Sequence, residues 1–359
     1  MGLVKVAGQP ASGPNNHAMA EKPVNQGDCL RYKLVWLAAV LALGVGVGAG
    51  LAQSRRGPGG GGPGGDRFGG GRLGGSVIRG EGGTVIDEAT VRTAREVVSH
   101  STGTPDWTNA PGFQKDAFTF ARVLFKTSPE AGRRSERDFG WDWWLGWWVD
   151  FPDADLNLSY RLQQLTALKV DPDGRVVRLT DPALTDYPFL FMEHPGYMEL
   201  DADETRNLRN YLLNGGALLV IDFWSQREWD GFEAQMKRVL PGRSWVDLPL
   251  SHPIFHCVYN LAGPMQMLQV PTIQFWNPDH DPRDPQSRIH NRYRGEGDEQ
   301  MHVRAWLDDK QRIMAVAIHN SDVSDGWERE GENDEYFHRY SEKIAYPLGI
   351  NLVVYLMTH

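Results

Sequence analysis

The sequence predicts an α/β fold in which a doubly wound, mostly parallel sheet carries helices on both faces. Residues 187–192, 217–221 and 313–318 are continuous apolar runs, as expected for strands that are buried on both faces of a parallel sheet. Segments with a helical spacing of apolar residues separate these runs, and this alternation is typical of the fold class. The chain has 359 residues, of which 41% are hydrophobic, which is enough for one large core.

The packed α/β domain is predicted to span residues 113–359. Its first strand is expected within residues 118–125, where β-branched and aromatic residues are frequent. Its first helix is expected at residues 156–168, where leucines recur at a helical spacing. The domain therefore opens with a strand followed by a helix.

Three further helices follow predicted strands. Asp201 and Glu204 form a capping box that predicts a helix start, and Gly215 predicts its end. The next helix is expected at residues 229–240, before a Pro-Gly pair, and an apolar final helix at residues 343–357. This order of elements predicts right-handed crossovers between parallel strands.

The N-terminal part has a different composition. A short basic tail, residues 1–33, precedes an uncharged apolar segment at residues 34–52, which is about as long as the roughly 20 residues that cross a bilayer. This segment is either a single transmembrane helix in the cytoplasmic membrane or the core of a signal peptide cleaved after Ala52. The C-terminal domain is then either anchored outside the membrane or released as a secreted or periplasmic protein. Residues 53–112 are predicted to be a Gly/Arg-rich flexible linker with a weak helix at residues 84–99.

Charge and cysteine content exclude several function classes. The net charge is −9, so a surface that binds nucleic acid is not expected. Cys29 and Cys257 are the only cysteines, which excludes a disulfide framework and a four-thiolate metal site. The apolar neighbours of Cys257 predict a buried thiol rather than a nucleophile. No P-loop motif is present, and a divalent metal is the one cofactor that the sequence leaves open.

Polar residues follow three predicted strands, at the sheet edge where open α/β sheets bind ligands. Glu193 and His194 follow the first strand, Asp222 the second, and His319 and Asp322 lie at the end of the third. These five residues are candidate metal ligands, and His194, Asp222 and His319 are the candidate catalytic residues. The alternative is that they are turn and cap residues that hydrogen-bond to the local backbone.

Two more segments are candidates for binding. Five of the thirteen tryptophans lie within residues 141–148; they are Trp141, Trp143, Trp144, Trp147 and Trp148. They could stack on a sugar or lie at a membrane interface, or they could form a hydrophobic lid over the sheet. Residues 322–335 are rich in acidic side chains, which could bind a cation or a basic partner, or form a solvated loop.

Several phrases taken together look like one bacterial family: DFPDADLNL, YPFLFMEHPGYMEL, LRNYLLNGGALLVIDFW, HNSDVSDGWERE and AYPLGINLVVYLMTH. From about Phe118 to His359 the chain resembles the domain-of-unknown-function family 4159. The resemblance implies a flavodoxin-like fold, similar to the class I glutamine amidotransferase group. It also implies an exported or membrane-anchored protein of the cell envelope, with MoxR-type ATPases and von Willebrand A domain proteins as partners. The family's usual phrase has two acids before Phe-Trp, whereas this chain has Ile221 and Asp222.

Two functions are compatible with these observations. No predicted strand is followed by a cysteine nucleophile, so the resemblance implies the fold of the amidotransferases and not glutaminase activity. The favoured hypothesis is a non-catalytic binding or scaffold module, held outside the cytoplasmic membrane by residues 34–52. The alternative hypothesis is a metal-assisted hydrolase that acts on an envelope component through the polar strand ends.

Overall fold

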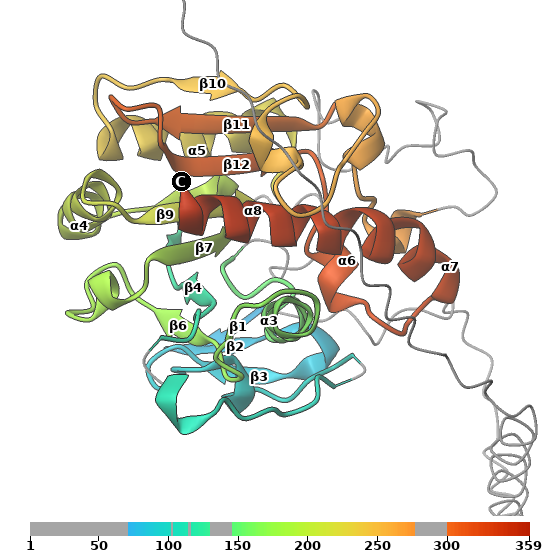
Figure 1. Cartoon of the computed structure of the whole chain (residues 1–359). Coiled ribbons are helices and arrows are strands. Elements are labelled where there is room, and N and C mark those ends of the chain that lie inside the picture. Colours follow the sequence, from blue (N-terminus) through green and yellow to red (C-terminus); the bar gives the residue numbers. More distant parts are fainter. Residues whose placement is uncertain (1–70, 102, 114–115, 130–145, 277–299) are drawn as a thin grey trace, which may run out of the picture. The chain divides into compact units, whose positions relative to one another are not determined.

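The computed structural model describes residues 71–101, 103–113, 116–129, 146–276 and 300–359 (Figure 1). Its main feature is a seven-stranded sheet with the strand order β10-β11-β12-β9-β7-β4-β6. The strands from β12 to β6 are parallel to one another, and β11 and β10 add two antiparallel pairings at one edge. The protein is therefore α/β, as predicted, and its sheet is mixed, with two antiparallel strands added to the parallel ones.

The parallel strands occupy the positions 2-1-3-4-5 when they are numbered along the chain. They are β6 (Arg175–Val177), β4 (Ala121–Val123), β7 (Phe189–Glu193), β9 (Ala217–Ile221) and β12 (Ile313–His319). The antiparallel strands are β11 (His302–Leu307) and β10 (Trp245–Asp247). A separate small sheet pairs β5 (Lys126–Thr127) with β8 (Met198–Glu199). Since β4 lies between β6 and β7, the chain order reverses at this point in the sheet.

Helices cover both faces of the sheet (Figure 1). Residues of α3 (Asp153–Leu165) and α8 (Tyr346–Thr358) belong to the core on one face, together with Phe189 and Phe191 of β7. Residues of α4 (Ala202–Leu213) and α5 (Ser225–Val239) belong to the core on the other face, together with Leu190 and Met192. Strand β7 is therefore apolar from Phe189 to Met192, because these successive side chains enter two different cores.

The predicted elements are recovered with shifted ends. The first helix begins at Asp153, three residues before the predicted start, and α5 begins at Ser225 instead of residue 229. The capping box is present, because Asp201 accepts the N–H groups of Asp203 and Glu204 while Glu204 accepts that of Asp201. The last helix is preceded by a π-helical segment, Phe337–Ala345.

Short helices connect these elements. Among the described residues, α6 (Asp325–Glu328) and α7 (Asp334–Tyr336) are short α-helices. The 3-10 helices are Glu81–Gly83, Ala94–Glu96, Pro111–Phe113, Leu184–Asp186, Pro195–Tyr197, Pro253–Phe255, Met265–Leu268 and Ile273–Phe275.

The segment before the domain differs from the predicted flexible linker. Strands β1 (Gly71–Gly74), β2 (Val77–Arg79) and β3 (Val85–Asp87) form an antiparallel sheet, and the helix predicted at residues 84–99 is absent from this described segment. Ile78 and Ile86 are 0% and 1% exposed and join the core. These β-branched residues bury enough surface to order a segment whose glycine content predicts disorder. The ordered domain therefore begins before residue 113.

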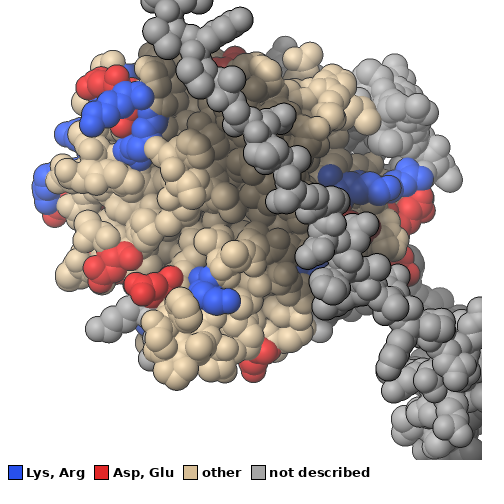
Figure 2. Space-filling model, viewed as in Figure 1, with Lys and Arg blue, Asp and Glu red and all other residues tan. Residues whose placement is uncertain are grey.

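The other N-terminal predictions, for residues 1–33, 34–52 and 53–70, lie outside the described residues. Within the part of the chain that the structure describes, no helix combines the length and apolarity needed to cross a membrane. On the face shown in Figure 2, acidic and basic side chains are interspersed.

The packing of helix α4 can be tested by comparing a leucine on its buried face with a leucine on its exposed face. Leu208 is fully buried, whereas Leu213 on the same helix is 50% exposed. Leu208→Ala is expected to lower the free energy of unfolding by about 2–5 kcal/mol, because it leaves a cavity in the core. The control Leu213→Ala should change it by no more than about 0.5 kcal/mol. Urea unfolding of both variants measures this, and equal losses would contradict the packing of α4 described here.

Candidate functional site

Three neighbouring parallel strands end in the same unusual way. Directly after β7, β9 and β12 stand His194, Asp222 and Asn320, with φ angles of 52°, 53° and 61°. These are left-handed conformations in residues other than glycine, which cost energy and gather at functional sites. The backbone N–H of His194 donates to the Ile221 oxygen at 3.1 Å, so the turn after β7 is tied to the end of β9.

Carboxylates from several loops meet at this edge. Oxygens of Asp150, Asp222 and Asp322 lie within 4.8 Å of one another, and so do oxygens of Asp150, Asp325 and Glu328. Each of these five residues is at most 3% exposed. We call the five residues the carboxylate centre, and Asp150 belongs to both of its groups.

Arg122 of β4 supplies positive charge beside the centre. Its guanidinium is fully buried; its Nε donates to Asp155 Oδ2 at 2.9 Å, and its Nη2 lies 2.7 Å from Glu193 Oε2. Burial alone would lower the pKa of Arg122, but Asp155 and Glu193 raise it above its ordinary value. For Glu193 the opposite holds: burial, aided by Asp150 and Asp222, raises its pKa well above the usual range despite Arg122. Glu193 is therefore a carboxyl group that holds a proton readily.

The same guanidinium also positions Asp150. Arg122 Nη1 donates to the backbone oxygens of Trp147 at 2.8 Å and Val149 at 2.9 Å. Asp150 follows directly, with a left-handed φ of 57°. This segment is not at the end of a parallel strand, so a buried ion from β4 brings its carboxylate to the strand ends.

His194 lies between two carboxylates. It is 1% exposed, and neither of its ring nitrogens has a hydrogen-bond partner. Its Nδ1 is 3.6 Å from Asp222 Oδ2 and its Nε2 is 3.8 Å from Glu228 Oε2. Glu228 is fixed by the backbone N–H of Trp224, which donates to Oε2 at 2.8 Å. An imidazole placed in this way can take up a proton or bind a cation.

His319 lies away from the carboxylate centre, in aromatic surroundings. Its Nε2 donates to the backbone oxygen of Ser225 at 3.0 Å, and its ring is 4.9 Å from that of Phe223 and 5.4 Å from that of Trp229. Burial lowers its pKa to about 3. The structure thus gathers Glu193, His194, Asp222 and Asp322 of the predicted set around one site and directs His319 into the core beside α5.

Sequence reasoning missed Asp150 as a site residue and did not single out Asp325 and Glu328 within the acidic stretch. In that stretch Asp322, Asp325 and Glu328 are buried, whereas its later acids, such as Asp334, are exposed. Asp322, Asp325 and Glu328 are spaced three residues apart. In a helical turn this spacing places side chains on one side, so the sequence contained a signal that these three acids lie together. Burial, and after it Asp150, raises the pKa of Asp325 to about 7.

The tryptophan segment is partly described. Trp147 and Trp148 are 0% and 3% exposed, and Trp147 Nε1 donates to Glu88 Oε1 at 2.9 Å. These two rings therefore have no exposed face for stacking on a ligand. Trp141, Trp143 and Trp144 lie outside the described residues.

The prediction of a buried Cys257 is wrong. The residue is exposed, because it follows the short 3-10 helix Pro253–Phe255 at the surface instead of a buried strand. Its Sγ donates to the backbone oxygen of Asn351 at 3.2 Å. Partial burial raises the pKa of the thiol, which makes it a poor nucleophile at neutral pH.

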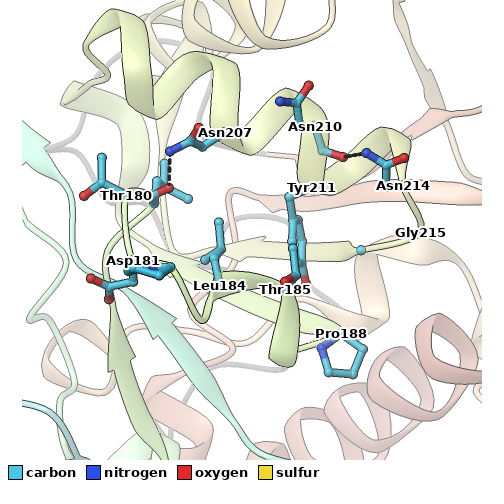
Figure 3. Close-up of a pocket in the computed structure, with 13 residues that line it drawn as sticks. Thr180, Asp181, Leu184, Thr185, Pro188, Asn207, Asn210, Tyr211, Asn214 and Gly215 are labelled. Atoms are coloured by element: carbon cyan, nitrogen blue, oxygen red, sulfur yellow. Dashed lines mark hydrogen bonds between the residues drawn. The ribbon is translucent and has the colours of Figure 1, made fainter.

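A pocket of about 520 Å³ lies at the other end of the strands (Figure 3). It is lined by Pro188, which precedes β7, by Gly216, which precedes β9, and by asparagines of α4 such as Asn207 and Asn210. This pocket is therefore at the amino ends of the strands and does not include the carboxylate centre.

The pKa of His319 predicts an acid-dependent loss of stability. Below the unfolded-state pKa of 6.5 the unfolded chain binds a proton that the native state, with a pKa of about 3, excludes. The free energy of unfolding should therefore fall as the pH decreases from 6.5 towards 3. His319→Gln, which keeps a donor for Ser225, should flatten this dependence, whereas His256→Gln at an exposed position should not. Urea unfolding at several pH values measures the slopes, and unchanged slopes in His319→Gln would contradict this assignment.

No curated protein matches this chain. The family model described as Domain of unknown function (DUF4159) matches residues 144–357, which is more than half of the sequence and contains all five residues of the carboxylate centre. By this match, the chain belongs to the DUF4159 family.

Proposed function

We propose that the domain is a metal-assisted hydrolase that acts on a component of the bacterial cell envelope. The observation that carries the proposal is His194, which is buried between two carboxylates at the edge where three parallel strands end. Open α/β sheets use this edge for ligands. Glu193 and Asp325 lie at the same edge and have pKa values that burial raises, and such groups are typical of catalytic sites.

The proposed fold subclass is flavodoxin-like, in the manner of the class I glutamine amidotransferases. The order 2-1-3-4-5 of the parallel strands supports it. In such sheets the ligand site lies where the chain order reverses, here between β4 and β7, and Arg122 and Glu193 come from these two strands. Glutaminase activity is not part of the proposal, because Cys257 lies at the surface after a 3-10 helix.

In the proposed hydrolase, His194 would act as the base and Glu193 as the acid. A divalent cation, when bound, supplies a Lewis acid and lowers the pKa of water. His194 accepts a proton, and Asp222 and Glu228, at 3.6 and 3.8 Å, stabilise the imidazolium that results. Glu193, whose pKa is raised by burial, is the carboxyl group that can donate a proton to a leaving group.

The envelope location rests on the sequence of residues 34–52. An apolar segment of this length supports a single-pass anchor that holds the domain outside the cytoplasmic membrane, or a cleaved signal that exports it. In both cases the substrate is a component on the outer side of that membrane.

A second candidate function is the non-catalytic scaffold favoured by the sequence. The burial of the carboxylate centre supports it, because each of the five residues is at most 3% exposed and closed ion sites are more often structural than catalytic. Such a scaffold would dock MoxR-type ATPases or von Willebrand A domain proteins, as the family resemblance implies.

The hydrolase proposal is tested with the full-length protein on isolated bacterial cell envelopes. Soluble sugars, peptides and phosphate released with and without Mn2+ are measured by chromatography and mass spectrometry. Release is expected to require Mn2+ and to fall on the order of 100-fold in His194→Gln, since an acid–base group contributes at least this factor. His256→Gln, which changes an exposed histidine that is not part of the carboxylate centre, should retain the rate.

Equal release by the two histidine variants would contradict the proposal. Absence of Mn2+-dependent release by the unmodified protein, together with stoichiometric capture of ATPase or von Willebrand A proteins by crosslinking in native membranes, would favour the scaffold.

A further inference from the structure

We infer that the carboxylate centre binds a single divalent cation that prefers oxygen ligands, held by Asp150, Asp222 and Asp322. This inference rests on the proposed function, for which it names the cofactor and its position. The inference also assigns the ion to one of the two carboxylate groups. Both groups contain Asp150, so the assignment distinguishes Asp222 and Asp322 from Asp325 and Glu328.

The spacing of the three carboxylates fits such an ion. Their oxygens lie within 4.8 Å of one another. A cation with metal–oxygen distances of about 2.1–2.5 Å holds opposite ligands about 4–5 Å apart. The oxygens therefore need to move little to surround it. Asp222 follows β9, Asp322 follows β12, and Asp150 is placed by the bonds from Arg122 to Trp147 and Val149, so three separate elements fix the three ligands.

A second observation points to a ligand at the same place. His194 is 1% exposed, neither ring nitrogen has a hydrogen-bond partner, and its Nδ1 faces Asp222 Oδ2 at 3.6 Å. Leaving a buried polar group without hydrogen bonds is costly. A hydrated cation beside Asp222 would place a water molecule that can donate a hydrogen bond to the imidazole nitrogen, which removes this cost and leaves His194 outside the ligand set.

The other carboxylate group already contains positive side chains. Arg329 Nε contacts Glu328 Oε2 and lies 3.4 Å from Asp325 Oδ1. His100 Nε2 contacts Glu328 Oε1 while its Nδ1 lies 2.9 Å from Asp153 Oδ2. A metal ion between Asp325 and Glu328 would have to compete with the guanidinium and the imidazole.

Neutral donors orient the carboxylates of the first group. Trp224 Nε1 donates to Asp222 Oδ1 at 2.9 Å, and Thr272 Oγ1 donates to Asp322 Oδ2 at 2.7 Å. Such bonds fix the direction of a carboxylate and keep its negative charge, as the outer partners of metal ligands do. Three carboxylates with one imidazole nearby suit Mg2+, Ca2+ or Mn2+ better than a thiophilic metal.

The experiment is a titration of the full-length protein with Mn2+, followed by electron paramagnetic resonance and calorimetry. The unmodified protein is expected to bind one Mn2+ per chain and to gain thermal stability from it. Asp322→Asn should weaken binding by more than about 100-fold, beyond the loss typical for an outer partner of a ligand. Asp325→Asn, a matched change in the other group, should weaken it by less than about threefold, and Asp334→Asn at the surface should leave it unchanged.

The outcomes separate this inference from the proposed function. Two ions per chain, or an equal loss in Asp322→Asn and Asp325→Asn, would overturn the assignment of a single ion to Asp150, Asp222 and Asp322. Circular dichroism identifies any variant that fails to fold. The stoichiometry of the unmodified protein shows without variants whether a single ion binds, and the two aspartate variants show which group holds it. No bound Mn2+ at millimolar concentration would overturn both the ion site and the metal-assisted hydrolase. One ion with unimpaired envelope hydrolysis in His194→Gln would leave the ion site and overturn the proposed mechanism.

Discussion

The arrangement of the candidate site depends on one buried ion, the guanidinium of Arg122. A guanidinium has five N–H donors and no acceptor, and in the interior each of them needs a partner. Here they reach the side-chain oxygens of Asp155 and Glu193 and the backbone oxygens of Trp147 and Val149. A helix, a neighbouring strand and a loop are thereby held at fixed positions around β4. Replacing Arg122 by a neutral residue would leave a buried negative charge without its partner. Removing one partner of a buried ion pair in this way strongly lowers the stability of a fold.

Around this ion the molecule has two regions with opposite physical character. The middle of the sheet is apolar on both faces and supplies most of the stability of the fold, through residues such as Phe191 and Leu218. At the carboxyl ends of the strands, buried carboxylates repel one another, and the backbone is left-handed at non-glycine residues. Neither feature favours folding. Both features are concentrated at the edge where the proposed ion site lies.

Sequence reasoning was accurate where the physical cause was local. The strands β7, β9 and β12 contain continuous apolar runs, and the cap at Asp201 is formed by residues three apart. It failed where distant contacts decide. Strand β11, which lies between the edge strand β10 and β12, interleaves apolar residues with His302 and Arg304. Strands β2 and β3 lie beside glycine-rich sequence and are ordered by burial against the core.

The candidate site shows the same division. The polar ends of three strands could be found from the sequence because parallel neighbours end at one edge. Asp150 could not, since Arg122 brings it there through contacts with the loop before it. The direction of His319 was available in principle: Ala315 and Ala317, four and two residues earlier, lie in the core beside α5, and alternation places His319 on that same side. Glu193 alternates with Phe189 and Phe191 on the opposite side, where α3 carries Asp155.

Strand β4 lies upstream of the segment that the family model matches, so the folding unit of this protein is larger than that segment. The family model begins at residue 144, whereas β4 ends at Val123 and lies between β6 and β7 in the sheet. A fragment cut at the family boundary would lack an interior strand, so β6 would have no neighbour and β7 would have an open edge inside the core. Residues upstream of the family segment are thus part of the same cooperative structure. The autonomous module is larger than the segment by which the family is recognised.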